Sequence, residues 1–245
     1  MTSFPLTTFT TAILQIAPEI ETDFSQDDYE QSVKEALQSY SKQFPDSYTE
    51  DITGDAGKYY PVTDLTQWVE GFSVITEMQY PAATIASDET PVLVDAEDYD
   101  PAYWVDVSGT QTRYIYFRTI APATTEAFRS TYSTPYTFSG SPEAVDVPAQ
   151  DFYALVKLAA CFACRSVATK YSLIGDSLVT ADAASHTTKA QEFRTNADKF
   201  CAGYRLDMGL PSDPSAAPIK PAQMFATRTV NPDWERGRRF LFHRS

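Results

Sequence analysis

The spacing of apolar positions predicts two helices in the first 45 residues. The first is short, has Thr7 or Thr8 as its expected cap, and ends near Pro18. The second follows Ser25, a good capping residue, and ends before Pro45, which cannot continue a helix. Its apolar face repeats every three or four residues and comprises Tyr29, Val33, Ala36, Leu37, Tyr40 and Phe44.

From about residue 46 the pattern changes to short segments rich in tyrosine, valine, isoleucine, threonine and phenylalanine. Glycine, proline and aspartate separate these segments, which is typical of strands and turns. Ser108, Gly109 and Thr110 form the expected loop of one hairpin. The predicted strands are residues 58–62, 73–80, 92–94, 103–107, 112–118 and 127–132.

A pair of long helices is predicted after Pro148. Residues 151–171 are apolar on most sides, so neighbouring elements should bury this helix. The next helix begins near Thr180 or Asp182, and the polar residues around Gly175 connect the two into an antiparallel hairpin. A heptad-like seam of the second helix comprises His186, Ala190, Phe193, Ala197, Phe200 and Tyr204.

This order of elements predicts an α+β fold, with a helical bundle formed by both flanks of the chain and a small antiparallel β domain inserted between them. The helical domain takes residues 1–45 and 148–210, and the inserted β domain takes residues 46–147. Residues 211–245 begin with several prolines and have no core of their own, so we expect an extended C-terminal arm.

Charge is distributed unevenly along the 245 residues, whose net charge is −14. Residues 1–150 hold 24 acidic and 6 basic residues, and such a negative body repels the phosphates of nucleic acid. No stretch of about 18 uninterrupted apolar residues occurs, so we expect no membrane contact. The first five residues lack the basic and apolar segments of a secretory signal. Three cysteines are too few for a disulfide framework, which favours a reducing compartment.

Candidate catalytic and metal-binding residues do not assemble into a site. Cys161, Cys164, Cys201 and His186 would make a zinc set by residue type. His186 and Cys201 share one predicted helix, however, where they would lie about 22 Å apart, so we expect three core cysteines and a buried or interfacial histidine. The acidic group 95–100 lacks the glycine and the glutamate of a calcium loop. We therefore predict no enzyme activity, no metal and no cofactor.

The last residues of the arm combine cationic and aromatic side chains. A solvated chain end is one interpretation, because termini are often poorly ordered. Solvated termini rarely carry three aromatic residues in nine positions, so we favour an arm that docks on an acidic partner surface. The expected anchors are Trp234, Arg236, Arg238, Arg239, Phe240 and Phe242.

Three stretches, taken in order, resemble head–tail adaptor (connector) proteins of tailed bacteriophages, in the version with a β domain inserted in a helical bundle. The first is GFSVITEMQYP at residues 71–81. The second comprises VLVDAEDY at 92–99, YIYF at 114–117 and FRSTYSTP at 128–135. The third comprises DFYALV at 151–156, ATKY at 168–171, Asp176-Ser177, Ala181-Asp182, His186 and KAQEF at 189–193. The resemblance covers most of residues 25–205.

This resemblance implies a virion structural protein in the neck between head and tail, made in the host cytoplasm. It implies a homo-oligomeric ring, twelve-fold in such proteins, whose arm reaches the portal protein while DNA passes through the lumen without specific binding. The inserted β domain would contact the capsid, the next tail or neck component, or a neighbouring subunit. The alternatives are a tail or baseplate binding module whose β domain recognises a host surface, and an enzyme with unrecognised acidic residues.

Overall fold

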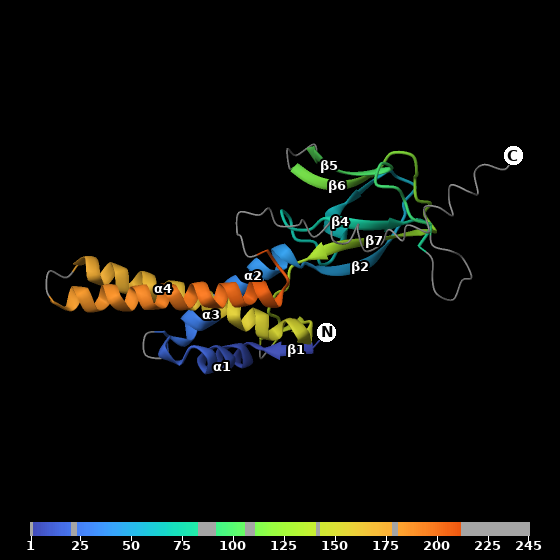
Figure 1. The fold of residues 1–245 in the computed structure, drawn as a ribbon. Helices are drawn as coiled ribbons and strands as arrows, with labels where there is room; N and C mark the ends of the chain where they lie inside the picture. The colour runs from blue at the N-terminus through green and yellow to red at the C-terminus, as the bar shows by residue number, and fades with distance from the viewer. Residues whose placement is uncertain are drawn as a thin grey trace. The chain divides into compact units, whose positions relative to one another are not determined.

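The computed structural model describes residues 2–20, 24–82, 92–105, 111–140, 143–177 and 181–211. The chain divides into two compact units (Figure 1). The helical unit is formed by the residues before Pro45 together with those after Pro135, and the β unit is Pro45–Pro135. The predicted α+β class, with helices from both flanks and small antiparallel sheets between them, is confirmed. The predicted arm lies outside the described residues.

The helical unit contains α1 (Leu6–Ile16), α2 (Gln26–Gln43), α3 (Phe152–Ser177) and α4 (Ala181–Asp207). Two short strands, β1 (Thr2–Pro5) and β8 (Ala144–Val147), pair antiparallel in the same unit. Neither strand was predicted. Residues 136–147, which the sequence analysis assigns to the β domain, lie in the helical unit. The pairing of β1 with β8 joins the two flanks of the chain directly.

The helix starts differ in how well the sequence predicts them. Ser25 caps α2 as predicted: its Oγ accepts the N–H of Asp28 at 3.3 Å, and its own N–H donates to an Asp28 carboxylate oxygen at 3.0 Å. The predicted cap of α1 is wrong, because Thr7 and Thr8 lie inside that helix. The preceding Pro5 ends a paired strand, and its fixed φ leads the chain directly into the first helical turn.

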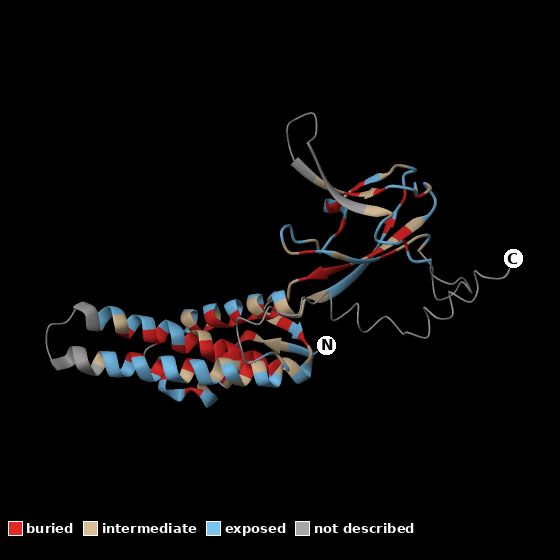
Figure 2. Ribbon diagram, turned by 45° about the horizontal axis from the view of Figure 1, so that its top comes forward, coloured by how far each residue is buried: buried red, intermediate tan, exposed pale blue. Residues whose placement is uncertain are grey.

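Helix α3 is buried on most sides, as its composition predicts. Its central residues include Ala159, Ala160, Ala163 and Val167, all fully buried, and the buried residues gather between the helices of this unit (Figure 2). The seam of α4 is confirmed at Ala190, Phe193, Ala197 and Tyr204, which are buried, whereas His186 and Phe200 are half-buried. Small residues on α3 let α4 approach closely and leave room for these aromatic rings.

One helical segment among the described residues, Ala149–Ile174, is long and apolar enough to cross a membrane. The sequence does not show it as an uninterrupted apolar stretch because polar residues such as Lys157, Arg165 and Lys170 lie within it. Of its most apolar window, 67% is buried against the rest of the protein. A helix that is surrounded by other helices is apolar on most sides, as a membrane-spanning helix is, because in both cases its side chains are shielded from water.

The cysteines correct a second expectation. Cys161 on α3 and Cys201 on α4 form a disulfide, with their Cα atoms 5.4 Å apart. Only Cys164 is a buried free thiol of the core. The expectation of core cysteines is confirmed for Cys161 and Cys164, which are buried, and Cys201 is partly buried against the same core. The expectation that the cysteines form no disulfide is wrong, because the antiparallel hairpin brings together two cysteines that are 40 residues apart in the chain.

The β unit contains two three-stranded antiparallel sheets. One has the order β2 (Asp46–Thr53), β7 (Ala127–Thr134) and β4 (Ile75–Gln79), and the other β3 (Tyr59–Pro61), β6 (Gln111–Phe117) and β5 (Tyr99–Val105). Strands β5 and β6 pair as predicted, although their predicted hairpin loop lies outside the described residues. The predicted strand 92–94 is wrong, since only Leu93 forms an isolated bridge, to Gln79. Strand β2 was not predicted.

The core of the β unit is aromatic. Phe128 on β7 is fully buried, with its ring centroid 4.7 Å from that of Tyr60 and 5.1 Å from that of Phe117. These edge-to-face contacts join residues from both sheets, which explains how a unit with short strands acquires a core. The other buried hydrophobic residues of this core are Ile52, Val62, Leu65, Met78, Val94, Ile115 and Tyr132.

Candidate functional site

The predicted anchors all lie outside the described residues, so the structure does not place Trp234, Arg236, Arg238, Arg239, Phe240 and Phe242. It does place the point where the arm begins. Helix α4 ends at Asp207, and Gly209 follows in the left-handed conformation with φ +64°. The N–H of Leu210 then donates to the Arg205 carbonyl at 2.8 Å. This left-handed glycine cap ends the helix and fixes the direction of Leu210.

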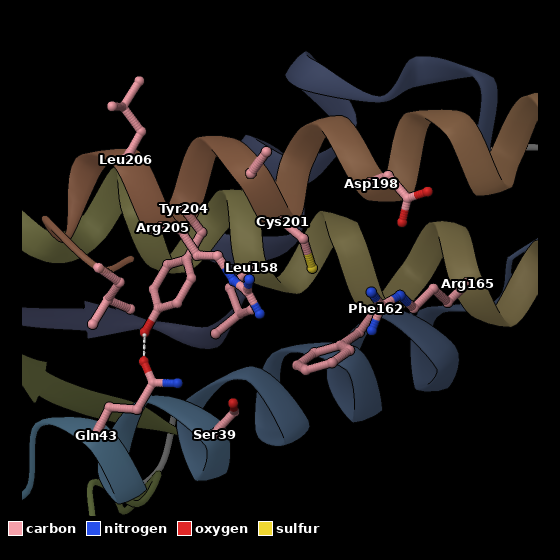
Figure 3. A pocket seen from close by; sticks show the side chains of 12 residues that line it. Ser39, Gln43, Leu158, Phe162, Arg165, Asp198, Cys201, Tyr204, Arg205 and Leu206 are labelled. Atoms are coloured by element: carbon pink, nitrogen blue, oxygen red, sulfur yellow. Dashed lines mark hydrogen bonds between the residues drawn. The ribbon is translucent and has the colours of Figure 1, made fainter. Parts of the chain in front are cut away.

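Leu210 lines a groove of about 550 Å³ between α2, α3 and α4, which we call the helical groove (Figure 3). Its apolar side chains come mainly from α3 and from the last turns of α4. Its residues are Ser39, Gln43, Leu158, Phe162, Arg165, Asp198, Cys201, Ala202, Tyr204, Arg205, Leu206 and Leu210. The volume is in the range of small-molecule sites and of grooves that receive a peptide side chain or two.

Three charged side chains line the helical groove: Arg165 on α3 and Asp198 and Arg205 on α4. Figure 3 shows the sulfur of Cys201 between the two guanidinium groups. The Tyr204 hydroxyl donates to the Gln43 side-chain oxygen at 2.9 Å, which links α4 to α2 at one end of the groove. The groove therefore combines an apolar floor, a net positive rim and one disulfide.

Two buried tyrosines of the helical unit, Tyr40 on α2 and Tyr204 on α4, form side-chain hydrogen bonds. The Tyr40 hydroxyl donates to the Asp151 carboxylate at 2.6 Å, and the ring is 1% exposed. Burial raises the pKa of Tyr40 well above its usual value, and the hydrogen bond to Asp151 raises it further. Burial also raises the pKa of Tyr204, with a smaller contribution from the Asp151 charge. Both phenols are therefore held neutral in the folded chain.

We expect Tyr40→Phe to lower the free energy of unfolding of the helical unit by about 1.5–3 kcal/mol, because the lost hydrogen bond has a charged acceptor. Tyr204→Phe is the matched control, since its acceptor Gln43 is neutral, and it should cost about 1 kcal/mol. Denaturant unfolding followed by helical circular dichroism measures both losses. Equal losses in the two variants would contradict the assignment.

The raised pKa values of Tyr40 and Tyr204 also predict how the stability of the helical unit depends on pH. Their contribution to the free energy of unfolding is fully present up to a pH of about 10, where tyrosines of the unfolded chain begin to lose their protons, and it is lost as the pH rises further.

The residues weighed for catalysis or metal binding do not come together in the part of the chain that the structure describes. His186 and Cys201 share α4, as predicted. The half-buried His186 ring stacks on Tyr171, with ring centroids 5.5 Å apart, as expected of a packing histidine. Among the described residues no three histidine, cysteine or acidic side chains lie close enough to hold a metal ion.

The β unit exposes apolar and aromatic side chains on an acidic background. Val74, Val92 and Leu93 are each more than half exposed, and the rings of Tyr59 and Tyr116 stack with centroids 4.8 Å apart. The unit holds 15 acidic and 4 basic residues. The sequence predicts a contact surface on this domain without indicating its residues, and it does not predict the helical groove.

No protein-family model matches the chain, and no curated protein matches it. Among solved structures, the chain is similar to one described as the neck of a native GTA particle, computed with C12 symmetry. The sequences are 14% identical, the similarity covers 65% of this chain and 81% of that chain, and the TM-score is 0.22. A TM-score of that size does not establish a shared fold.

Proposed function

We propose that this chain is a structural protein of a phage neck: a head–tail adaptor whose copies form a ring under the portal and whose residues 211–245 dock on the portal. In this proposal the ring has twelve copies, the chain catalyses no reaction, and the anchors are the aromatic and cationic residues between Trp234 and Phe242. The protein joins the DNA-filled head to the tail by its shape and its contacts.

The observation that carries the proposal is the match between the resembling stretches and the units of the structure. Residues 71–81, 92–99, 114–117 and 128–135 lie in the β unit. The stretches between residues 151 and 193 lie on the α3–α4 hairpin of the helical unit. A helical unit built from both flanks, with a β unit inserted between residues 44 and 136, is the arrangement that the resemblance implies.

The charge distribution supports a role around DNA without binding to it. The β unit and the first 44 residues are acidic, so surfaces that they present to a lumen repel the phosphates. The cationic residues are concentrated after residue 211, where 6 basic residues outnumber 3 acidic ones. An arm of this composition suits an acidic protein surface, and it wraps that surface at an entropic cost on ordering.

Electron microscopy of the full chain mixed with portal rings of the same phage tests the proposal. We expect a continuous density of regularly repeated copies around one axis on one face of the portal, because a head-to-tail interface closes only by rotation. A chain that stays monomeric and leaves the portal bare would contradict the proposal. Binding of such a chain to host cells through its β unit would favour the tail or baseplate alternative.

A further inference from the structure

The Cys161–Cys201 disulfide forms part of the helical groove, and its two sulfurs differ in access. Cys161 is fully buried in the core, whereas Cys201 is half-buried and lines the groove. In Figure 3 the Cys201 side chain points from α4 toward α3, and its sulfur is drawn among the side chains that line the groove. Of the two bonded residues, Cys201 is therefore the one on the side from which a thiol in solvent approaches.

Charged side chains lie near Cys201 in the helical groove. Arg165 and Arg205 line the groove on either side of the sulfur, and Asp198 is the third charged side chain of the lining. A net positive groove attracts an anionic thiol, and guanidinium groups bind carboxylates in fixed geometry. The volume of about 550 Å³ accommodates a molecule the size of a tripeptide.

We propose that Cys201 is the site at which a small thiol carrying carboxylate groups opens the α3–α4 disulfide. The thiolate attacks the sulfur of Cys201, a new disulfide forms between them, and the bond to Cys161 breaks. Cys161 leaves as a thiolate and takes up a proton. A second molecule of the same thiol then attacks the mixed disulfide, so that two small thiols are oxidised to one disulfide and both cysteines are reduced.

The third cysteine does not compete with this route. Cys164 lies one turn from Cys161 on α3, but its thiol is buried and burial raises its pKa to about 12. At neutral pH it therefore holds its proton and is a poor nucleophile toward the disulfide. The exchange depends on the helical groove alone, and it stands whether or not the chain is a neck protein.

Two single variants test which sulfur is reactive. Cys161→Ser leaves a free thiol in the groove, Cys201→Ser leaves one in the core, and both lose the same cross-link. With oxidised glutathione and intact-mass detection, we expect Cys161→Ser to form its mixed disulfide roughly ten-fold faster or more than Cys201→Ser. Equal rates would overturn the proposal. Circular dichroism establishes that both variants keep their helices.

The role of the charges is tested on chains that keep the disulfide, so no variant depends on folding without it. Arg165→Gln and Arg205→Gln should each slow reduction by glutathione roughly three-fold or more, and should leave reduction by the neutral thiol 2-mercaptoethanol unchanged. Arg194→Gln is the matched control on α4, because Arg194 donates to Ser172 and does not line the groove. The proposed selection would be overturned if the arginine variants slowed reduction by glutathione and by 2-mercaptoethanol equally, or if they slowed neither reaction.

Discussion

Deleting residues 222–245 is expected to abolish binding of the chain to portal rings while leaving both compact units folded. The deleted segment contains all the proposed anchors and carries more basic than acidic residues. Among the residues that the structure describes, both units have a hydrophobic core of their own, and we expect these cores to hold the units together after the deletion. Co-sedimentation with portal rings measures the binding, and circular dichroism together with tryptophan fluorescence measures the fold.

Two matched variants separate the contributions of the arm. Replacing Trp234, Phe240 and Phe242 by alanine removes buried contact area and should speed dissociation, because aromatic anchors carry most of the energy of an interface. Replacing Arg236, Arg238 and Arg239 by glutamine should mainly slow association and weaken its dependence on salt. A truncated chain that still co-sediments with portals at the affinity of the full chain would refute the proposed role of the arm.

The sequence predicts the helical elements well because each of them carries its own pattern. In α2 the cap at Ser25, the apolar spacing from Tyr29 to Tyr40 and the stop before Pro45 all lie within the segment. In the α3–α4 hairpin, small and aromatic residues recur at helical spacing over more than twenty positions. The residues at this spacing are buried in the structure, except that His186 and Phe200 are only half-buried.

The missed strands have a common physical cause. Strand β2 buries only Ile52, because it is an edge strand with polar side chains on its exposed positions. Strands β1 and β8 are four residues long each, and they are strands only because they pair with one another across more than 130 positions. Pairing of this kind depends on long-range contacts, which a local pattern does not report.

The helical groove and its disulfide were missed for a similar reason. The groove is lined by residues of three helices and by Leu210, so the pattern of no single segment predicts it. One signal was present in the sequence. Cys201 follows Phe200 of the predicted seam, and Cys161 lies in the helix predicted to pack against it. In an antiparallel pairing of these two helices the two cysteines face one another, as the disulfide requires.

Gly54, the residue after β2 in the β unit, has no room for a side chain. A Cβ atom on Gly54 would lie 2.5 Å from the Ala123 carbonyl oxygen and 2.6 Å from that of Pro122. The N–H of Gly54 donates to the Glu126 carbonyl at 2.8 Å, and the N–H of Ala56 donates to Pro122 at 2.8 Å. These hydrogen bonds hold the segment after β2 against the loop before β7, so neither backbone can move aside without losing them.

We therefore expect Gly54→Ala to lower the free energy of unfolding of the β unit by about 3 kcal/mol, the upper end for an overpacked site, because the obstructing atoms are backbone. Gly57→Ala is the matched control: its added Cβ would meet only the Asp55 carboxylate, the end of a flexible side chain, and we expect a loss of about 1 kcal/mol or less from the N–H bond to that carboxylate. Denaturant unfolding followed by tryptophan fluorescence reports mainly on the β unit, which holds Trp68 and Trp104, two of the three tryptophans. Helical circular dichroism reports on the other unit. Equal losses for the two glycines would contradict the steric argument, and an equal shift of both transitions in Gly54→Ala would show that the two units unfold as one.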